Sequence, residues 1–323
     1  MKTWIGLAIA LGVALSAGET SAADKVRLVI SQKMPWELFA PEHAVAEGYY
    51  KAENLEVEIS YASGGADTLQ TIITGDQDIT TGNGALGVVA AFAKGAPVKI
   101  IGNSGRGTHD VFWYVPVASP IKTIKDLEGK ELVYSRPGST THLIGQEILR
   151  LSGVKAKLVS VGDPSASRTM VMSGQVATAW APFPANYDLV RKGETRIVVT
   201  GAAATTMEND TIRVIAANAN WLKSNRSVAE RFLRATWKGM ELQYKLTDAG
   251  IKRYADKWGL DPQDIREAPK FIPFHTVTYQ PFGNLEGLIK TALDLKMLRE
   301  PLTEEQKKDL IDFVWKSPDV PKS

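Results

Sequence analysis

The chain contains no cysteine among its 323 residues. This absence excludes a disulfide scaffold, a thiolate nucleophile and a zinc or iron–sulfur site held by cysteine. Histidine is scarce, and the spacing of His43, His109, His142 and His275 matches no metal-ligand pattern. We therefore predict that the protein holds no metal and no cofactor.

An excess of either charge is also missing. The 38 Lys and Arg residues nearly balance the 36 Asp and Glu residues, which leaves a net charge of +2. Proteins that follow a nucleic-acid backbone are usually far more basic, so nucleic acid is excluded as a partner.

Motifs of catalysis are lacking too, since the chain has no G-x-S-x-G elbow, no H-E-x-x-H and no P-loop. The segment Gly82–Gly87 does fit G-x-G-x-x-G, the dinucleotide fingerprint. That fingerprint also needs an acidic residue at the end of the next strand, where this chain has Ile101-Gly102-Asn103. We interpret these glycines as a tight turn with close packing, and we predict no enzyme activity.

Long hydrophobic runs are limited to one short segment near the N-terminus. Lys2 precedes the apolar run Trp4–Leu15, and the small residues Ala22 and Ala23 follow it. About twelve residues cannot cross a hydrocarbon core of about 30 Å as a helix. The order of basic, apolar and small residues predicts a secretory signal peptide over 1–22, cleaved near Ala22. We therefore expect an exported, periplasmic protein, and without a following cysteine we expect no lipid anchor.

What the chain does have is a repeated alternation of strand and helix patterns. Strands are predicted over 25–30, 55–59, 78–81 and 98–101, with helices over 41–51, 66–74 and 86–93 between them. This order indicates an α/β fold with a largely parallel sheet.

The alternation then restarts, which predicts a second lobe. Strands are expected over 112–117, 131–134 and 157–161, and helices over 141–151 and 165–173. An internal sequence similarity supports two similar units, because an amphipathic helix pattern ends at Gly75 in one and at Gly174 in the other. Two further strands are expected at 197–199 and 211–215. The C-terminal part that follows them is predicted to be helical over 226–246, 247–258, 284–298 and 303–315, and we expect this part to pack on the first lobe. We assign 23–115 and 209–323 to lobe I and 116–208 to lobe II.

Two loops between a strand and a helix are candidates for an anion site. One is the loop at Arg136 and the segment Ser139, Thr140, Thr141 and His142 in lobe II, and the other is Ser63, Gly64 and Gly65 in lobe I. Free N–H groups at a helix N-terminus attract anions, although the hydroxyl groups could equally serve only as helix caps. Arg136 either adds a charged partner or points to solvent.

Aromatic residues stand near the corresponding loops. Trp36 follows the first strand, and Trp180 and Phe183 flank a turn of the second lobe. Each could pack in a core or stack on a ligand. Gln32, in the same loop as Trp36, and Asn83, in the glycine turn, complete the predicted ligand-binding set.

Taken together, these segments resemble the solute-binding proteins of ABC importers in the nitrate/sulfonate/taurine (NitT/TauT-like) branch. The resemblance rests on an ordered set of segments, namely 47–57, 63–65, 93–100, 121–130, 137–142 and 172–176. It implies a type II periplasmic-binding-protein fold, in which two α/β lobes close about a hinge on one small molecule. It also implies delivery of that molecule to the transmembrane subunits of an ABC permease. We expect a monomer.

The resemblance leaves the ligand open, because relatives bind nitrate, sulfonates or heteroaromatic thiamine precursors. Helix ends favour an anion and aromatic residues favour a ring or an alkyl tail. We therefore expect a small organic anion, sulfonate- or carboxylate-bearing, with an aromatic or alkyl part. The alternatives are a near-neutral heteroaromatic such as a thiamine-precursor pyrimidine, and a periplasmic sensor subunit. Enzymes share this fold, but the best known use a cysteine-rich motif or work in the cytoplasm.

Overall fold

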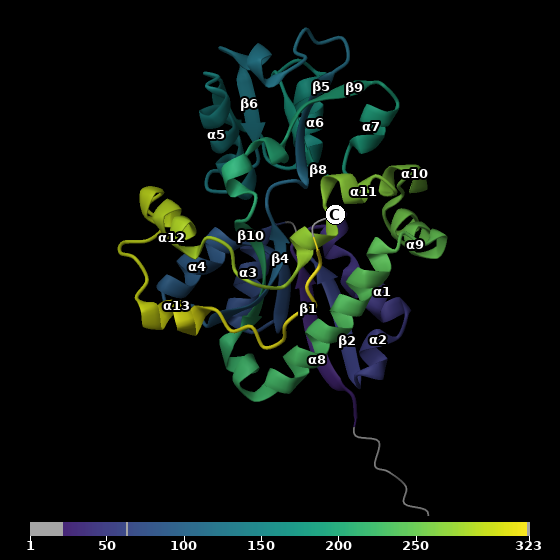
Figure 1. Ribbon diagram of the computed structural model, residues 1–323, viewed down its shortest axis with the longest axis vertical. Helices are drawn as coiled ribbons and strands as arrows, with labels where there is room; N and C mark the ends of the chain where they lie inside the picture. The colour runs from purple at the N-terminus through teal and green to yellow at the C-terminus, as the bar shows by residue number, and fades with distance from the viewer. Residues whose placement is uncertain (1–21, 63, 322–323) are drawn as a thin grey trace, which may run out of the picture.

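The computed structural model describes residues 22–62 and 64–321. Residues 1–21 of the predicted signal peptide and Ser63 of the predicted ligand loop lie outside this part of the chain. Within it, two lobes are stacked along the long axis of the molecule (Figure 1). None of the helices in the described ranges combines the length and the apolar character needed to cross a membrane.

Lobe I is built on a five-stranded mixed sheet. Its strand order is β2 (Leu55–Tyr61), β1 (Asp24–Ile30), β3 (Ile79–Gly84), β10 (Thr211–Asn218) and β4 (Val98–Arg106). β1 runs parallel to β2 and β3, whereas β10 runs antiparallel to both of its neighbours. The sheet is therefore less parallel than predicted, because the chain inserts β10 only on its return from lobe II.

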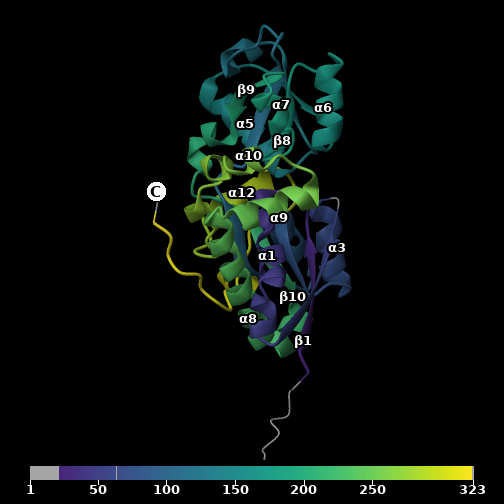
Figure 2. The ribbon, with the colours of Figure 1, turned by 90° about the vertical axis from the view of Figure 1, so that its right-hand side faces the viewer.

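Two layers of helices cover this sheet because residues in its strands point alternately to opposite faces. Leu28 and Ile30 of β1 join one apolar cluster and Val29 joins the other. The first face is covered by α1 (Ala40–Ala46), α2 (Tyr49–Ala52) and α8 (Ala219–Tyr244). The second is covered by α3 (Gly65–Thr74), α4 (Ala85–Ala93), α12 (Leu285–Asp294) and α13 (Glu304–Leu310). Figure 2 shows α3 and α8 on opposite sides of the sheet.

Lobe II contains a smaller antiparallel sheet and a parallel strand pair. β5 (Val111–Pro116) lies between β8 (Ala179–Pro182) and β9 (Thr195–Thr200), and β6 (Glu131–Tyr134) pairs with β7 (Lys157–Ser160). The helices are α5 (Thr140–Ser152), α6 (Pro164–Met172) and α7 (Tyr187–Arg191). By its pairing β5 belongs to lobe II, so the first crossover precedes Val111 and not residue 116. A short apolar strand does not reveal from sequence which sheet it joins.

The C-terminal part is helical as expected, with altered boundaries. α8 is kinked at Asn225, whose φ of −125° and ψ of 26° are not helical, so the helix predicted over 226–246 follows a short helical segment that begins at Ala219. The Asn218 side chain caps this segment by accepting from the N–H groups of Asn220 and Trp221. α9 (Asp248–Trp258) is capped by Thr247, and the predicted capping box of Thr303 and Gln306 starts α13. The remaining short helices are η1 (Trp36–Leu38), η2 (Ile124–Leu127), η3 (Gly201–Ala203), η4 (Thr205–Met207), η5 (Phe274–Val277), α10 (Pro262–Ile265) and α11 (Ala268–Phe271).

The tail does not pack on lobe I alone. Phe271 of α11 stacks on Phe183 of lobe II with ring centroids 4.6 Å apart. Arg191 of α7 forms ion pairs with Asp264 at 2.5 Å and with Asp261 at 2.7 Å. The segment of α10 and α11 therefore joins the two lobes along one side, in addition to the chain crossovers.

Candidate functional site

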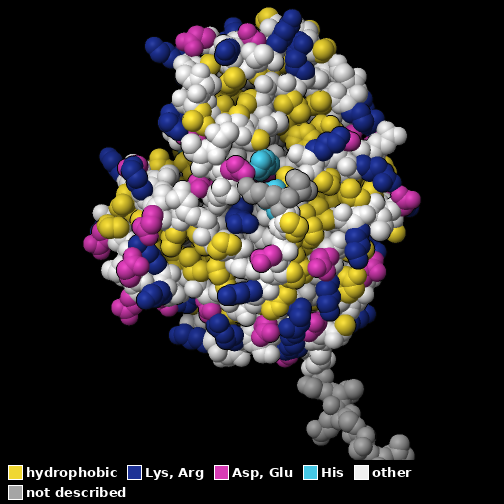
Figure 3. All heavy atoms as spheres, in the orientation of Figure 1, with side chains coloured by type: hydrophobic (Ala, Val, Ile, Leu, Met, Phe, Trp, Pro, Cys, Tyr) yellow, Lys and Arg dark blue, Asp and Glu magenta, His cyan; other side chains and the backbone are white. Residues whose placement is uncertain are grey.

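A cleft of about 1660 Å³ lies between the lobes. Its lobe I wall comes from the loops after β1, β2 and β3 and from β10, and its lobe II wall comes from the loops that precede α5 and α6 and from β8. In the space-filling view the molecule narrows between the lobes on the side where α5 lies above α12 (Figures 1 and 3). Nine predicted residues line the cleft: Gln32, Gly64, Gly65, Asn83, Arg136, Ser139, Thr140, Thr141 and Trp180.

The lobe I wall presents two helix N-termini without side-chain caps. α3 begins after Gly64 and α4 after Gly84, neither glycine has a side-chain oxygen, and no other side chain among the described residues caps either end. The two ends are adjacent, because a Cβ on Gly65 would stand 3.6 Å from the Gly84 nitrogen. Unsatisfied N–H groups and the positive ends of two helix dipoles thus meet at one place in the cleft.

The glycine turn of β3 is structural, as predicted. Gly82 has a φ of +86°, and a Cβ there would lie 2.3 Å from Ser31 Oγ and 2.6 Å from a Leu38 methyl carbon. The Asn83 side chain is also used internally, since its Nδ2 donates to the Gly65 carbonyl and its Oδ1 accepts from the Thr80 hydroxyl. Asn83 therefore fixes the two helix ends relative to each other, and its amide is committed.

The lobe II wall begins with α5, whose N-terminus is capped. Ser139 Oγ accepts from the His142 N–H at 3.2 Å, and Thr141 Oγ1 accepts from the Ser135 N–H at 3.0 Å. Thr140 lies closest to lobe I, with its Oγ1 3.8 Å from where a Cβ on Gly84 would stand. Both interpretations of this loop hold in part, because Ser139 caps the helix and Thr140 faces the opposite wall.

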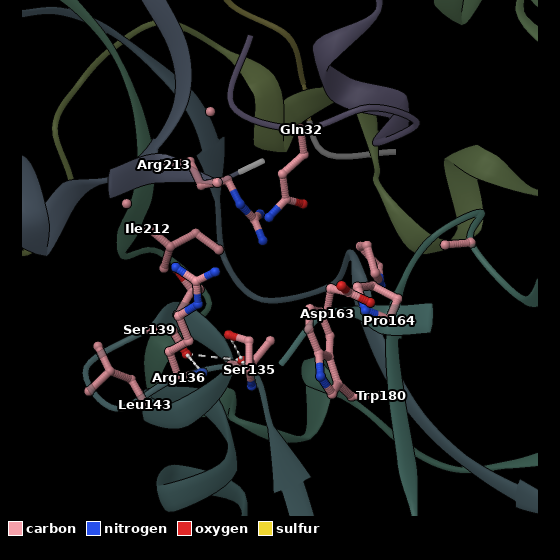
Figure 4. A pocket seen from close by; sticks show the side chains of 18 of the residues that line it. Gln32, Ser135, Arg136, Ser139, Leu143, Asp163, Pro164, Trp180, Ile212 and Arg213 are labelled. Atoms are coloured by element: carbon pink, nitrogen blue, oxygen red, sulfur yellow. Dashed lines mark hydrogen bonds between the residues drawn. The ribbon is translucent and has the colours of Figure 1, made fainter. Parts of the chain in front are cut away.

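α6 and β8 supply the rest of the lobe II wall. Asp163 caps α6 by accepting from the N–H groups of Ser165 and Ala166 at 2.8 and 2.9 Å. Trp180 of β8 lines the cleft and donates from Nε1 to the Gly162 carbonyl at 3.3 Å. Figure 4 shows the Trp180 ring beside Asp163 and Pro164. The end of α6 is therefore occupied by its own carboxylate, and Trp180 supplies an aromatic surface.

Three predicted residues do not line the cleft. Trp36 is 1% exposed and packs edge-on against Tyr254 at 5.2 Å, inside the core between β1 and the C-terminal helices. Phe183 is fully buried under Phe271, close to the crossover. His142 turns away, because its ring stacks on Tyr134 at 4.3 Å and its Nδ1 accepts from the Gly138 N–H. Burial also lowers the pKa of His142. For all three, packing against neighbouring rings replaces the predicted contact with a ligand.

Arg213 of β10 was not among the ligand-binding residues predicted from the sequence. It lines the cleft, and its Nη2 lies 2.6 Å from Asp110 Oδ2 while its Nη1 lies 3.7 Å from Glu37 Oε1. Burial opposes its charge, yet the two carboxylates hold the pKa of Arg213 above its ordinary value. Figure 4 shows its guanidinium beside the Gln32 side chain. An arginine within an apolar strand, Thr211–Ile215, was the signal in the sequence.

Unpaired cations outnumber unpaired anions around the cleft mouth. Lys33, Arg136 and Arg168 line the cleft and, within the described residues, form no ion pair. Asp163 is engaged as a cap, and Asp210 accepts from Asn284 Nδ2 at 2.9 Å. Burial raises the pKa of Asp210, so its charge is disfavoured. In residues 22–62 and 64–321, His, Asp and Glu side chains do not gather in threes or more as a metal site needs.

Comparison with solved structures shows the same fold in two sulfonate-binding proteins. The periplasmic aliphatic sulphonate binding protein SsuA of Escherichia coli has a TM-score of 0.72 at 19% identity, over 89% of this chain and 98% of its own. The alkanesulfonate-binding SsuA of Xanthomonas axonopodis pv. citri, bound to MOPS, has a TM-score of 0.71 at 18% identity, over 89% and 99%.

A more distant likeness is a mutant of DszB in complex with biphenyl-2-sulfinic acid. Its TM-score is 0.59 at 16% identity, over 87% of this chain and 95% of its own. These likenesses establish the two-lobed periplasmic-binding-protein fold. No curated protein sequence matches the chain significantly.

The family is established separately, by a sequence comparison with family models. The model described as "NMT1/THI5 like" matches residues 42–248, which is more than half of the chain. The match runs from α1 through the whole of lobe II to the start of α9. The chain therefore belongs to the NMT1/THI5-like family.

Proposed function

We propose that this protein is an extracytoplasmic solute-binding protein that captures a small organic anion in its interlobe cleft and passes it to an ABC permease. The anion carries a sulfonate or carboxylate and has an alkyl or aromatic part. The observation that carries the proposal is the meeting of two uncapped helix N-termini, α3 and α4, opposite unpaired cations of lobe II.

The anionic head is assigned to the lobe I wall. N–H groups at Gly65 and Ala85 and the Thr140 hydroxyl surround one point where the lobes approach each other. Each helix end stabilises a negative charge by about 0.3–1 kcal/mol, and N–H donors add charge-assisted hydrogen bonds. A sulfonate offers three oxygens to such donors. The sulfonates named for the two SsuA structures and the sulfinate of the third neighbour are consistent with this head group.

The tail is assigned to the apolar part of the same cleft. Leu143 of α5, Ile212 of β10 and Trp180 of β8 line it, and Figure 4 shows them on the two sides of the space below Arg213. A bare inorganic anion would leave this surface uncovered. The volume of the cleft also exceeds what ethanesulfonate-sized molecules fill, which favours a longer alkyl chain or a ring.

Export and delivery follow from the same proposal. The residues that precede Asp24 have the basic, apolar and small-residue order of a signal peptide. Both SsuA neighbours are described as sulfonate-binding proteins, and the one from Escherichia coli is described as periplasmic. We assign the mature protein to the periplasm as a monomer that presents its closed form to permease subunits. A sensor subunit would use the same cleft, and co-purification with a permease rather than a receptor kinase separates the two.

Titration calorimetry with a homologous series tests the ligand class. Residues 23–323, freed of bound ligand by unfolding and refolding, are titrated with ethane-, butane- and octane-1-sulfonate, benzenesulfonate and hydroxymethylpyrimidine. We expect the sulfonates to bind, and each added methylene to tighten binding by about 0.8 kcal/mol, roughly fourfold, until the apolar surface is covered. Binding of the neutral pyrimidine alone would overturn the proposal in favour of the thiamine-precursor alternative.

A further inference from the structure

A buried cluster of three charged side chains lies at the floor of the cleft. Arg213 comes from β10, Asp110 from the crossover before β5 and Glu37 from η1. Glu37 and Asp110 are 4% and 6% exposed, whereas Arg213 keeps an edge toward the cleft. One cation thus faces two carboxylates, and it is the only member of the cluster that a ligand can reach directly.

Glu37 lies farther from the cation than Asp110 does. Its Oε1 is 3.7 Å from Arg213 Nη1, whereas Asp110 Oδ2 is 2.6 Å from Arg213 Nη2. Glu37 Oε2 and Asp110 Oδ2 both lack a hydrogen-bond partner among the described residues. Two phenols from the C-terminal helices also face it, but Tyr244 donates to the Ile272 carbonyl and Tyr254 to the Met34 carbonyl. A cavity of about 20 Å³, lined by residues such as Thr81, Ser104 and Tyr279, adjoins it on the side of lobe I. No described cation other than Arg213 balances its charge.

We propose that Arg213 is the deep anion-binding residue of the cleft, and that Glu37 is a positioning residue that takes up a proton when an anion binds there. With Glu37 ionised, the cluster has one net negative charge and repels an anion. With Glu37 protonated, Asp110 alone balances Arg213, so an anion meets a neutral cluster with an exposed guanidinium edge. The proton comes from the solvent and ends on the Glu37 carboxylate, and no other bond changes. This inference rests on the proposed anionic ligand.

The direction of the pH dependence follows from linkage. Burial, and then the Asp110 charge, raise the pKa of Glu37 to about 7, while Arg213 opposes the rise. A bound anion adds a further negative charge and raises the pKa of Glu37 again in the complex. Affinity is then constant below the pKa of the free protein and falls as pH rises from about 7 to the pKa of the complex. A further rise of one pKa unit makes binding about tenfold weaker above that range.

The experiment uses butane-1-sulfonate, whose own charge does not change with pH. Wild type and Glu37→Gln are titrated calorimetrically between pH 6 and 9, and at pH 7.5 in phosphate and in Tris, which differ in ionisation enthalpy. For wild type we expect Kd to rise about sixfold between pH 6.5 and 8.5, with uptake of about half a proton at pH 7.5. Glu37→Gln keeps the low-pH affinity at all pH values and takes up no proton. Arg213→Gln weakens binding at every pH.

The outcomes separate this inference from the proposed function. Wild-type binding without pH dependence or proton uptake overturns the role of Glu37 and leaves the anion-binding function standing. Proton uptake that persists in Glu37→Gln assigns the proton to another group, such as Asp210 or His142, and also overturns it. If Glu37→Gln does not fold, the wild-type proton count alone decides. Absence of binding by every sulfonate overturns this inference and the sulfonate head group of the proposed function.

Discussion

At the scale of single residues, the same types of side chain occur in the cleft and in the apolar cores. Trp36 follows β1 and Trp180 lies within β8, and Trp36 is enclosed by Tyr244 and Tyr254 while Trp180 lines the cleft. The Trp36 carbonyl also accepts from Gln243 Nε2 at 2.6 Å, which ties η1 to α8. Trp36 therefore contributes to stability, whereas Trp180 presents its ring to a ligand.

The substitution Trp36→Ala is expected to destabilise the protein without changing ligand contacts. Loss of a fully buried tryptophan costs about 3–5 kcal/mol, because the surrounding rings cannot fill the space. Urea unfolding measures this change, with exposed Val117→Ala as the control that shifts stability by no more than about 0.5 kcal/mol. Butanesulfonate affinity of the folded variant should stay within about twofold of wild type. Lost binding at unchanged stability would show that Trp36 contacts the ligand after all.

At the scale of elements, α3, α4, α5 and α6 present two classes of N-terminus to the cleft. α5 and α6 are capped by Ser139 and Asp163, so their first N–H groups are already satisfied. α3 and α4 follow Gly64 and Gly84 and are not capped. Only the uncapped pair can give its donors to a ligand without first losing an internal hydrogen bond. This difference assigns the anionic head to lobe I.

Supplying α4 with a carboxylate cap tests this assignment. Gly84 has φ −58° and ψ 123°, which any residue adopts, and a Cβ there has no contact closer than 3.8 Å. Gly84→Asp should leave stability unchanged or raise it by a few tenths of a kcal/mol, since aspartate is a good cap. Its carboxylate competes for the same N–H groups and repels an anion, so sulfonate affinity should fall more than tenfold. Gly84→Ala has the same Cβ without the charge, and an equal loss in that control would refute the electrostatic explanation.

At the scale of the whole molecule, the lobes are held together along one side as well as through the chain crossovers. Arg191 of lobe II pairs with Asp261 and Asp264 beside α10, and Phe271 packs on Phe183 and Tyr187. On the opposite wall Thr140 approaches Gly84. The segment 259–272 therefore contacts both lobes on this side.

The ion pairs of Arg191 are predicted to hold the lobes in this arrangement. Arg191→Ala leaves the Asp264 carboxylate, whose side chain is 2% exposed, without its cation, which should cost about 1–3 kcal/mol in urea unfolding. Small-angle X-ray scattering of the ligand-free variant should give a larger radius of gyration than wild type. Lys192→Ala, which removes only the exposed pair with Asp188, is the matched control. Equal behaviour of the two variants would mean that the Arg191 pairs do not restrain the lobes.

The family resemblance could be drawn from the sequence because it depends on local order. The strand and helix patterns of lobe I, the glycine turn at Gly82 and the capping box of α13 all follow from neighbouring residues. Most of the predicted binding residues line the cleft for the same reason, since Gln32, Gly64, Gly65 and the segment 136–141 follow strands that pair in parallel, and such loops meet at one edge of a sheet. Trp180 lies instead within the antiparallel strand β8.

Neighbouring residues alone therefore specified the alternation of elements, the capping box of α13 and the tight turn that requires Gly82. Long-range packing specified which sheet β5 joins, which tryptophan is buried and where Arg213 finds Asp110 and Glu37. These features depend on contacts between residues that are up to about two hundred positions apart. Local propensity and periodicity carry no information about such pairings, because only tertiary packing brings these residues together.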